Sequence, residues 1–177
     1  MSYAFSKLFW GFFLVLLEIH LFVIDVLPDP IGYLLIYLGI NHLITEFPVG
    51  NKPRNIALIL IFLSIPTVFI QQNASSSSMS QLSGWSVYVT ILALLKLILV
   101  YYLFQLMMKI AHRYGDSILA NRTLTTFRNY MISMLLIHIV EPFSMNFLTG
   151  EHISYVVISA MVGLIMEIVL LVLLRRY

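Results

Sequence analysis

The sequence predicts an all-α integral membrane protein, a single domain over residues 1–177 built as a bundle of six transmembrane helices. Composition and charge placement predict this fold. The chain is 60% hydrophobic and only 10% charged, with a mean hydropathy of +0.96, whereas a soluble domain carries about 25% charged residues. So few charges could not cover a surface facing water, so we expect lipid to surround most of the chain.

Six apolar runs have the length expected of membrane spans or come close to it, since a membrane helix needs about 20 mainly apolar residues. The expected spans are 8–25, 30–46, 55–71, 85–108, 129–148 and 153–174. The first run follows Lys7, as in a secretory signal, but it continues to polar residues without a small-residue cleavage site. We therefore expect it to be retained as a span.

The basic residues predict the orientation of the bundle. With six spans, every Lys and Arg except Lys96 falls on one side of the membrane: Lys7, Lys52, Arg54, Lys109, Arg113, Arg122, Arg128, Arg175 and Arg176. The positive-inside rule makes that side cytoplasmic, and both ends of the chain with it. Basic clusters beside membrane spans also attract anionic lipid, so the bilayer itself is an expected partner.

Two ionisable residues lie deep in their expected spans. At 1.5 Å per helical residue, Glu18 and Lys96 are both about 15 Å from the span ends. A charge at the centre of a bilayer costs about 2.5–3.5 kcal/mol, so such side chains face the bundle interior. We expect an ion pair between Glu18 and Lys96, either as a structural link or as part of a site.

The fifth expected span contains a second polar group. His138 and Glu141 are three residues apart and share one helix face, and Pro142 cannot donate a hydrogen bond to the carbonyl of His138, which predicts a kink. Imidazole and carboxylate suit zinc or iron, but the residues do not name a metal or a cofactor. The hypothesised centre for a ligand or an ion combines five residues: Glu18, His20, Lys96, His138 and Glu141.

Small residues indicate where helices pack closely. Gly32 and Gly39 lie seven residues apart in the second span, and Ser159, Gly163 and Glu167 recur every four residues in the sixth. Small side chains at these spacings allow membrane helices to approach each other. We therefore expect Glu167 to face another helix and to contribute to packing or to a partner contact.

An acidic turn joins the first two spans. Asp29 is a good N-cap, and Pro30 is a good first helical residue. Asp25 and Asp29 together could alternatively form an external mouth for a cation or a basic ligand. The stretch LPDPIGYLLIYLGINHL resembles a pattern in small membrane proteins of Gram-positive bacteria. The resemblance covers the first two spans and implies a bacterial plasma membrane protein, without implying an activity.

Three functional hypotheses follow. The first is a binding or accessory membrane protein that works with a membrane protein partner or a small-molecule ligand. The second is a solute-binding subunit of a transporter, since the substrate-binding subunits of energy-coupling-factor vitamin transporters are similar in size and topology; their alanine-rich first helix contrasts with LFWGFFLVLLEIHLF here. The third is an intramembrane enzyme or metal protein.

Catalytic and nucleic-acid functions find little support in the residues. No phosphate-binding loop, nucleophile elbow or zinc-protease motif occurs in the sequence, so an enzyme is the less favoured interpretation. The chain has no cysteine, which excludes thiolate chemistry. Its net charge of +2 does not indicate nucleic acid as a partner.

Overall fold

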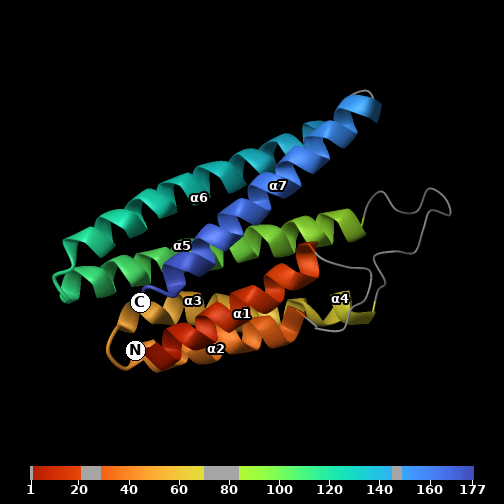
Figure 1. Cartoon of the computed structure of the whole chain (residues 1–177). Helices are drawn as coiled ribbons and strands as arrows, with labels where there is room; N and C mark the ends of the chain where they lie inside the picture. The colour runs from red at the N-terminus through yellow and green to blue at the C-terminus, as the bar shows by residue number, and fades with distance from the viewer. Residues whose placement is uncertain (1, 21–28, 70–83, 145–148) are drawn as a thin grey trace.

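The computed structural model describes residues 2–20, 29–69, 84–144 and 149–177, and every regular element in these ranges is helical (Figure 1). The elements are α1 Ser2–His20, α2 Asp29–Ile44, the short 3₁₀ helix η1 Pro48–Gly50, α3 Asn51–Leu63, α4 Ile65–Phe69, α5 Trp85–Arg113, α6 Ser117–Ser144 and α7 Thr149–Leu174. The all-α prediction is confirmed. Within α5 and α7, the stretches Val87–Arg113 and Ser154–Leu174 are long and apolar enough to cross a membrane.

The helices pack in chain order around a closed ring. Helix α1 packs on α2, α2 on α3, α3 on α5, α5 on α6, α6 on α7, and α7 returns to α1. Figure 1 shows α6 and α7 as a hairpin inclined to α1 and α5, so that the two helices lie near α1 and α5 at the end that holds the C-terminus and diverge from them towards the other end. Side chains that point into the ring therefore come from helices far apart in sequence.

Glycines hold α1 and α2 at close range. A Cβ atom on Gly11 would lie 2.7 Å from the carbonyl oxygen of Gly32, and one on Gly39 would lie 2.9 Å from the carbonyl oxygen of Ala4. No side chain larger than hydrogen fits at such distances without moving backbone. Gly32 and Gly39 thus lie where close packing requires small residues, and Gly11 supplies the matching surface on α1.

The third expected span, 55–71, consists of two helices that meet at Ser64. Pro66 follows this break and has no backbone N–H to donate. Two backbone carbonyls at the break accept hydrogen bonds from side chains. The hydroxyl of Thr67 donates to the carbonyl of Ser64 at 2.7 Å, and the hydroxyl of Tyr88 on α5 donates to the carbonyl of Leu63. Side-chain hydroxyl groups therefore satisfy the backbone carbonyls of Leu63 and Ser64 beside Pro66.

The sequence places a cytoplasmic connection at 109–128, and the polar residues at its start have the spacing of a helix that continues from the fourth span. Helix α5 continues to Arg113, Gly115 takes a left-handed conformation with φ of 70°, and the backbone N–H of Leu119 donates to Asp116 Oδ1 at 2.8 Å as α6 begins. Most of the expected connection, 109–128, is therefore helical. Helix α6 then runs for 28 residues through Pro142 to Ser144.

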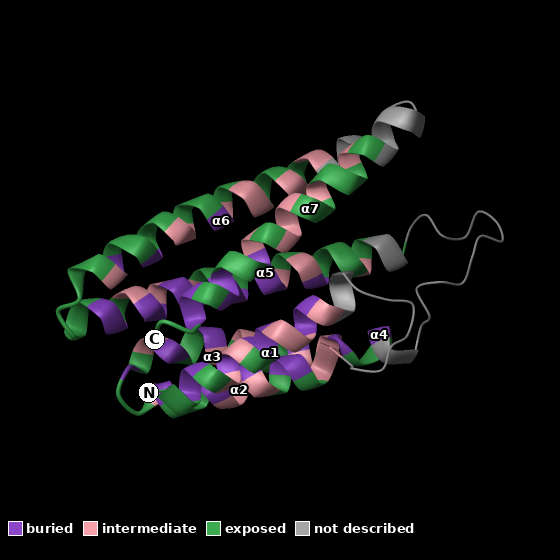
Figure 2. Ribbon diagram, viewed as in Figure 1, coloured by how far each residue is buried: buried purple, intermediate pink, exposed green. Residues whose placement is uncertain are grey.

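Burial differs strongly between the two ends of the ring. The end that holds both termini is densely packed, and its fully buried side chains include Leu8, Phe104, Met107, Leu170 and Leu174. By contrast, no described side chain of residues 131–140 or 154–166 is buried, and Figure 2 shows these parts of α6 and α7 in pink and green. The core thus fixes the hairpin at one end only.

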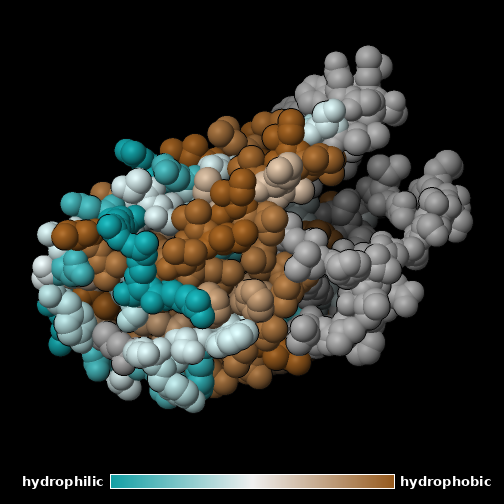
Figure 3. Space-filling model, viewed as in Figure 1, coloured by the Kyte–Doolittle hydropathy of each residue, from teal (hydrophilic) through white to brown (hydrophobic). Residues whose placement is uncertain are grey.

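Polar and apolar surfaces are separated along the ring. Figure 3 shows a hydrophilic end next to a broad apolar surface. Exposed branched side chains are numerous on α5, α6 and α7, among them Ile91, Ile98, Leu136, Ile158 and Ile165. Soluble monomers rarely expose an apolar patch larger than a few hundred Å². The basic residues gather at the hydrophilic end, where Arg113 at the end of α5 donates to the carbonyl of Glu46 at 3.1 Å.

Candidate functional site

A buried ion pair links α5 to α7. Lys96 lies in the middle of α5 and is 9% exposed, while Glu167 lies in the last third of α7 and is 1% exposed. The Nζ atom of Lys96 is 2.7 Å from Glu167 Oε1. In the part of the chain that the structure describes, the backbone of α7 lies next to α6 and α1, so the long lysine side chain supplies the link between α5 and α7.

Tyr130 on α6 completes a three-helix network. Its hydroxyl donates to the same oxygen, Glu167 Oε1, at 3.0 Å, and the side chain is 1% exposed. The ring of Phe104 on α5 lies 5.8 Å from the ring of Tyr130 and helps to fix its orientation. One carboxylate oxygen therefore accepts hydrogen bonds from two other helices of the ring.

The network lies in apolar surroundings. Leu92, Leu99 and Val100 beside Lys96 are buried, as are Leu170 and Leu171 beside Glu167. Opposite charges in such surroundings compensate each other's loss of hydration, so each charge depends on its partner. The second oxygen, Glu167 Oε2, is also buried and has no hydrogen-bond partner among the described residues. The carboxylate thus keeps one buried oxygen that accepts no hydrogen bond from the described residues.

The structure pairs Lys96 with Glu167, a carboxylate that the sequence-based prediction did not assign to it. The described contact of Lys96 is with Glu167 at 2.7 Å, and the predicted pair with Glu18 stays a prediction. Glu18 and His20 are in the last turn of α1, and their side chains lie outside the described part. The packing role predicted for Glu167 is therefore accompanied by an ion pair that the spacing of small residues did not indicate.

The polar residues expected on the fifth span lie on α6. His138 is half-buried, and the hydroxyl of Tyr155 on α7 donates to the carbonyl of its neighbour Ile137 at 2.9 Å. The side chain of Glu141 lies outside the described part. Within the ranges that the structure describes, no group of three or more His, Asp or Glu side chains could hold a metal ion.

The structure describes the predicted acidic turn only in part. Asp25 lies outside the described residues, and Asp29 is the first residue of α2, half-buried, with no described hydrogen-bond partner for its Oδ1 atom.

The small-residue stripe predicted on the sixth span lies on α7. Ser159 donates to the carbonyl of Val156 in its own helix at 3.0 Å, and a methyl group added to Gly163 would have no described atom within 4 Å. Glu167 is therefore the member of that stripe that contacts other helices.

Tyr177 forms a second junction at the basic end. Its hydroxyl lies 2.7 Å from Thr123 Oγ1 on α6 and donates to the carbonyl of Met107 on α5 at 3.1 Å. Its ring stacks on Phe5 of α1 at 4.9 Å. Burial raises the pKa of the Tyr177 phenol, the hydrogen bond with Thr123 lowers it, and nearby Asp116 raises it, with a net increase. The neutral phenol therefore suits this junction.

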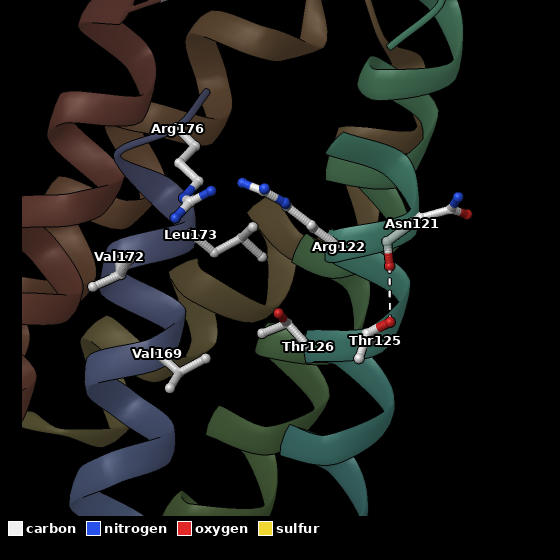
Figure 4. Close-up of a pocket in the computed structure, with 8 residues that line it drawn as sticks. All are labelled: Asn121, Arg122, Thr125, Thr126, Val169, Val172, Leu173 and Arg176. Atoms are coloured by element: carbon white, nitrogen blue, oxygen red, sulfur yellow. Dashed lines mark hydrogen bonds between the residues drawn. The ribbon is translucent and has the colours of Figure 1, made fainter. Parts of the chain in front are cut away.

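A cavity of about 460 Å³ opens between α6 and α7 at the same end (Figure 4). Its lining residues are Asn121, Arg122, Thr125, Thr126, Val169, Val172, Leu173 and Arg176. Figure 4 shows Arg122 and Arg176 extending towards each other from the two helices, whereas Asn121 points away. The cavity combines two guanidinium groups with an apolar wall.

Tyr130, Tyr177 and the two cavity arginines were not predicted as functional residues. Thr123 and Tyr130 are seven residues apart on α6 and both are buried, so the heptad spacing of two polar side chains was a usable signal. The pairing of Lys96 with Glu167 had no such signal, since it depends on which helices are neighbours in the ring. Arg122 and Arg176 belong to the basic residues that the sequence indicated as determinants of orientation and as contacts with anionic lipid, but not as a cavity.

Comparisons with models of known protein families, with curated proteins and with solved structures give no match to this chain.

Proposed function

We propose that this chain is a multi-pass plasma membrane protein with six spans and both ends in the cytoplasm. We propose further that it is of the binding or accessory type and works with a membrane partner. The exposed apolar side chains of α5, α6 and α7 support a lipid environment, because water would not tolerate so large an apolar surface. The grouping of basic residues at the end that holds both termini supports the orientation.

The Lys96–Glu167–Tyr130 network is the observation that carries the accessory type. The buried ammonium and phenol groups are directed at a carboxylate of the same chain, so these charges serve to hold three helices together. A transport site needs polar groups that face an accessible cavity. The cavity between α6 and α7 instead lies at the basic end of the ring, and the start of α2 lies at the other end.

A solute-binding subunit is the second candidate. Glu167 Oε2 supports it, because this atom is buried and has no hydrogen-bond partner among the described residues. An unsatisfied buried acceptor costs about 1–3 kcal/mol, and a protonated amine or a small cation bound there would recover that cost. Such a ligand would enter the interior of the ring beside Lys96.

Affinity purification from the native membrane separates the two candidates. The full-length chain would be tagged, extracted in mild detergent, and analysed with everything that elutes with it by mass spectrometry. We expect a membrane protein partner at a fixed ratio. Elution of the chain alone would contradict the accessory type, and co-elution with an ATPase and its membrane subunit would establish the transporter subunit in its place.

A further inference from the structure

The cavity between α6 and α7 brings two positive charges together without an acidic neighbour. Arg122 on α6 and Arg176 just after α7 extend towards each other (Figure 4), and no acidic residue lines the cavity. Neither guanidinium has an ion-pair partner within the described ranges. Because two like charges at close range repel each other, an anion between them would stabilise this arrangement.

The cavity changes from charged to apolar along the helix axes. Thr126 lies beside Arg122 on α6, and Figure 4 shows its hydroxyl side chain facing the space towards α7. Val169 and Val172 line the opposite side and are exposed, and they continue into the exposed apolar surface at Ile165 and Ile168. A ligand that matches these charged and apolar parts of the cavity has an anionic head attached to an apolar chain.

We propose that this cavity binds the headgroup phosphate of an anionic phospholipid, an inference that rests on the proposed membrane location. The two guanidinium groups would each offer paired N–H donors to phosphate oxygens. The first methylene groups of the acyl chains would lie along Val169 and Val172. A volume of about 460 Å³ holds a headgroup and the start of its chains, whereas a free phosphate ion would leave the apolar wall unused.

A ligand titration on the full-length protein in detergent tests this site. The thermal unfolding midpoint would be measured with rising dioctanoyl phosphatidylglycerol, and separately with dioctanoyl phosphatidylcholine and with inorganic phosphate. The variant R122Q/R176Q removes both cavity charges. The matched control K109Q/R128Q removes two positive charges from exposed positions outside the cavity, so the two variants have the same net charge.

We expect phosphatidylglycerol to stabilise the wild type, and R122Q/R176Q to raise its half-saturating concentration by about tenfold or more while the control changes it by about twofold or less. An equal loss in both variants would show attraction to surface charge alone and overturn the site. Stabilisation by inorganic phosphate at the same concentrations would replace the lipid with a free anion. Absence of any stabilisation of the wild type would overturn the proposal outright.

The membrane location is tested separately by alkaline carbonate extraction of the membranes. Release of the chain into the supernatant would contradict the proposed multi-pass function, whereas the titration in detergent would still report on the anion site. A chain that resists extraction but does not distinguish the two lipids would leave the membrane location standing and remove the lipid site. The two failures are therefore distinguishable.

Discussion

The carboxylate of Glu167 accepts two hydrogen bonds on one oxygen in a setting where each charge needs the other. Removing one partner of a buried ion pair leaves the other charge uncompensated, which costs about 3–5 kcal/mol, whereas replacing both partners with apolar residues is often neutral. We therefore expect E167L and K96L each to lower the thermal unfolding midpoint in detergent strongly. The double variant K96L/E167L should recover most of the loss.

The comparison of single and double variants also separates Glu167 from Glu18 as the partner of Lys96. If Lys96 depended on Glu18, then E18L/K96L would show the recovery and K96L/E167L would not. The hydroxyl of Tyr130 adds one hydrogen bond to a charged group, worth about 1.5–3 kcal/mol, so Y130F should have a smaller effect than E167L. The variant Y114F is its control, because Tyr114 is exposed. Equal effects of Y130F and Y114F would contradict the network.

At the residue scale, the sequence identified which side chains are unusual but not which of them meet. Hydropathy and the helical rise were enough to place Lys96 deep in its span, and the structure shows it buried. Its partner depended on the order of helices around the ring, which a single sequence does not contain. Tyr130 escaped notice because a tyrosine in an apolar helix is ordinary until a carboxylate is placed beside it.

At the scale of elements, the crossing of α1 and α2 depends on glycine. In G11A the new methyl group would lie 2.6 Å from Ile36 Cγ1 and 2.7 Å from the carbonyl oxygen of Gly32, and overpacking of this kind costs about 1–3 kcal/mol. We expect G11A to lower the unfolding midpoint. The matched control is G163A on α7, where no described atom lies within 4 Å of the added position and alanine favours the helix by up to about 1 kcal/mol. Destabilisation by G163A equal to that by G11A would contradict the close crossing.

The junction at Tyr177 predicts a dependence on alkaline pH. The pKa of the folded phenol is raised above 10.0, with burial as the largest cause, so the folded state favours the neutral form. The stabilisation is therefore fully present below the pKa of the unfolded phenol and is lost as pH rises through the higher folded value. The difference in unfolding midpoint between wild type and Y177F should be constant near pH 8 and shrink above pH 10. A difference that grows with pH would contradict the assignment, and Y114F controls for exposed phenols.

Element positions were largely predictable, but element ends were not. All six expected spans overlap described helices, because the apolar runs mark the parts of the helices that avoid water. The continuation of α5 to Arg113 agrees with the helical spacing of Lys109, His112 and Arg113, whereas the start of α6 was missed because hydropathy reports contact with lipid and not helix formation. Residues such as Arg122 and Arg128 are helical and polar, so they extend α6 beyond its apolar run. The Ser64 break was detectable, since Pro66 removes a backbone donor.

The whole molecule is polarised along its length. Basic residues from four separate parts of the sequence gather at the end that holds both termini, while the middle of the ring exposes mainly branched apolar side chains (Figure 3). A chain inserted with this end in the cytoplasm satisfies the positive-inside rule at every connection. Lys96 is the exception, and its charge is balanced inside the ring by Glu167.

Cysteine labelling tests this orientation directly, because the chain contains no cysteine. Gly84 precedes α5 and Ser117 begins α6, both are exposed, and one expected span separates them. A membrane-impermeant maleimide added to intact cells should label G84C at once, and should label S117C only after the membrane is permeabilised.

Ser2 is exposed and lies four expected spans before Ser117, so S2C should behave like S117C. Labelling of S2C and G84C from the same side would contradict an odd number of spans between them. Labelling of S117C in intact cells would reverse the proposed orientation and place the Arg122–Arg176 cavity outside the cell.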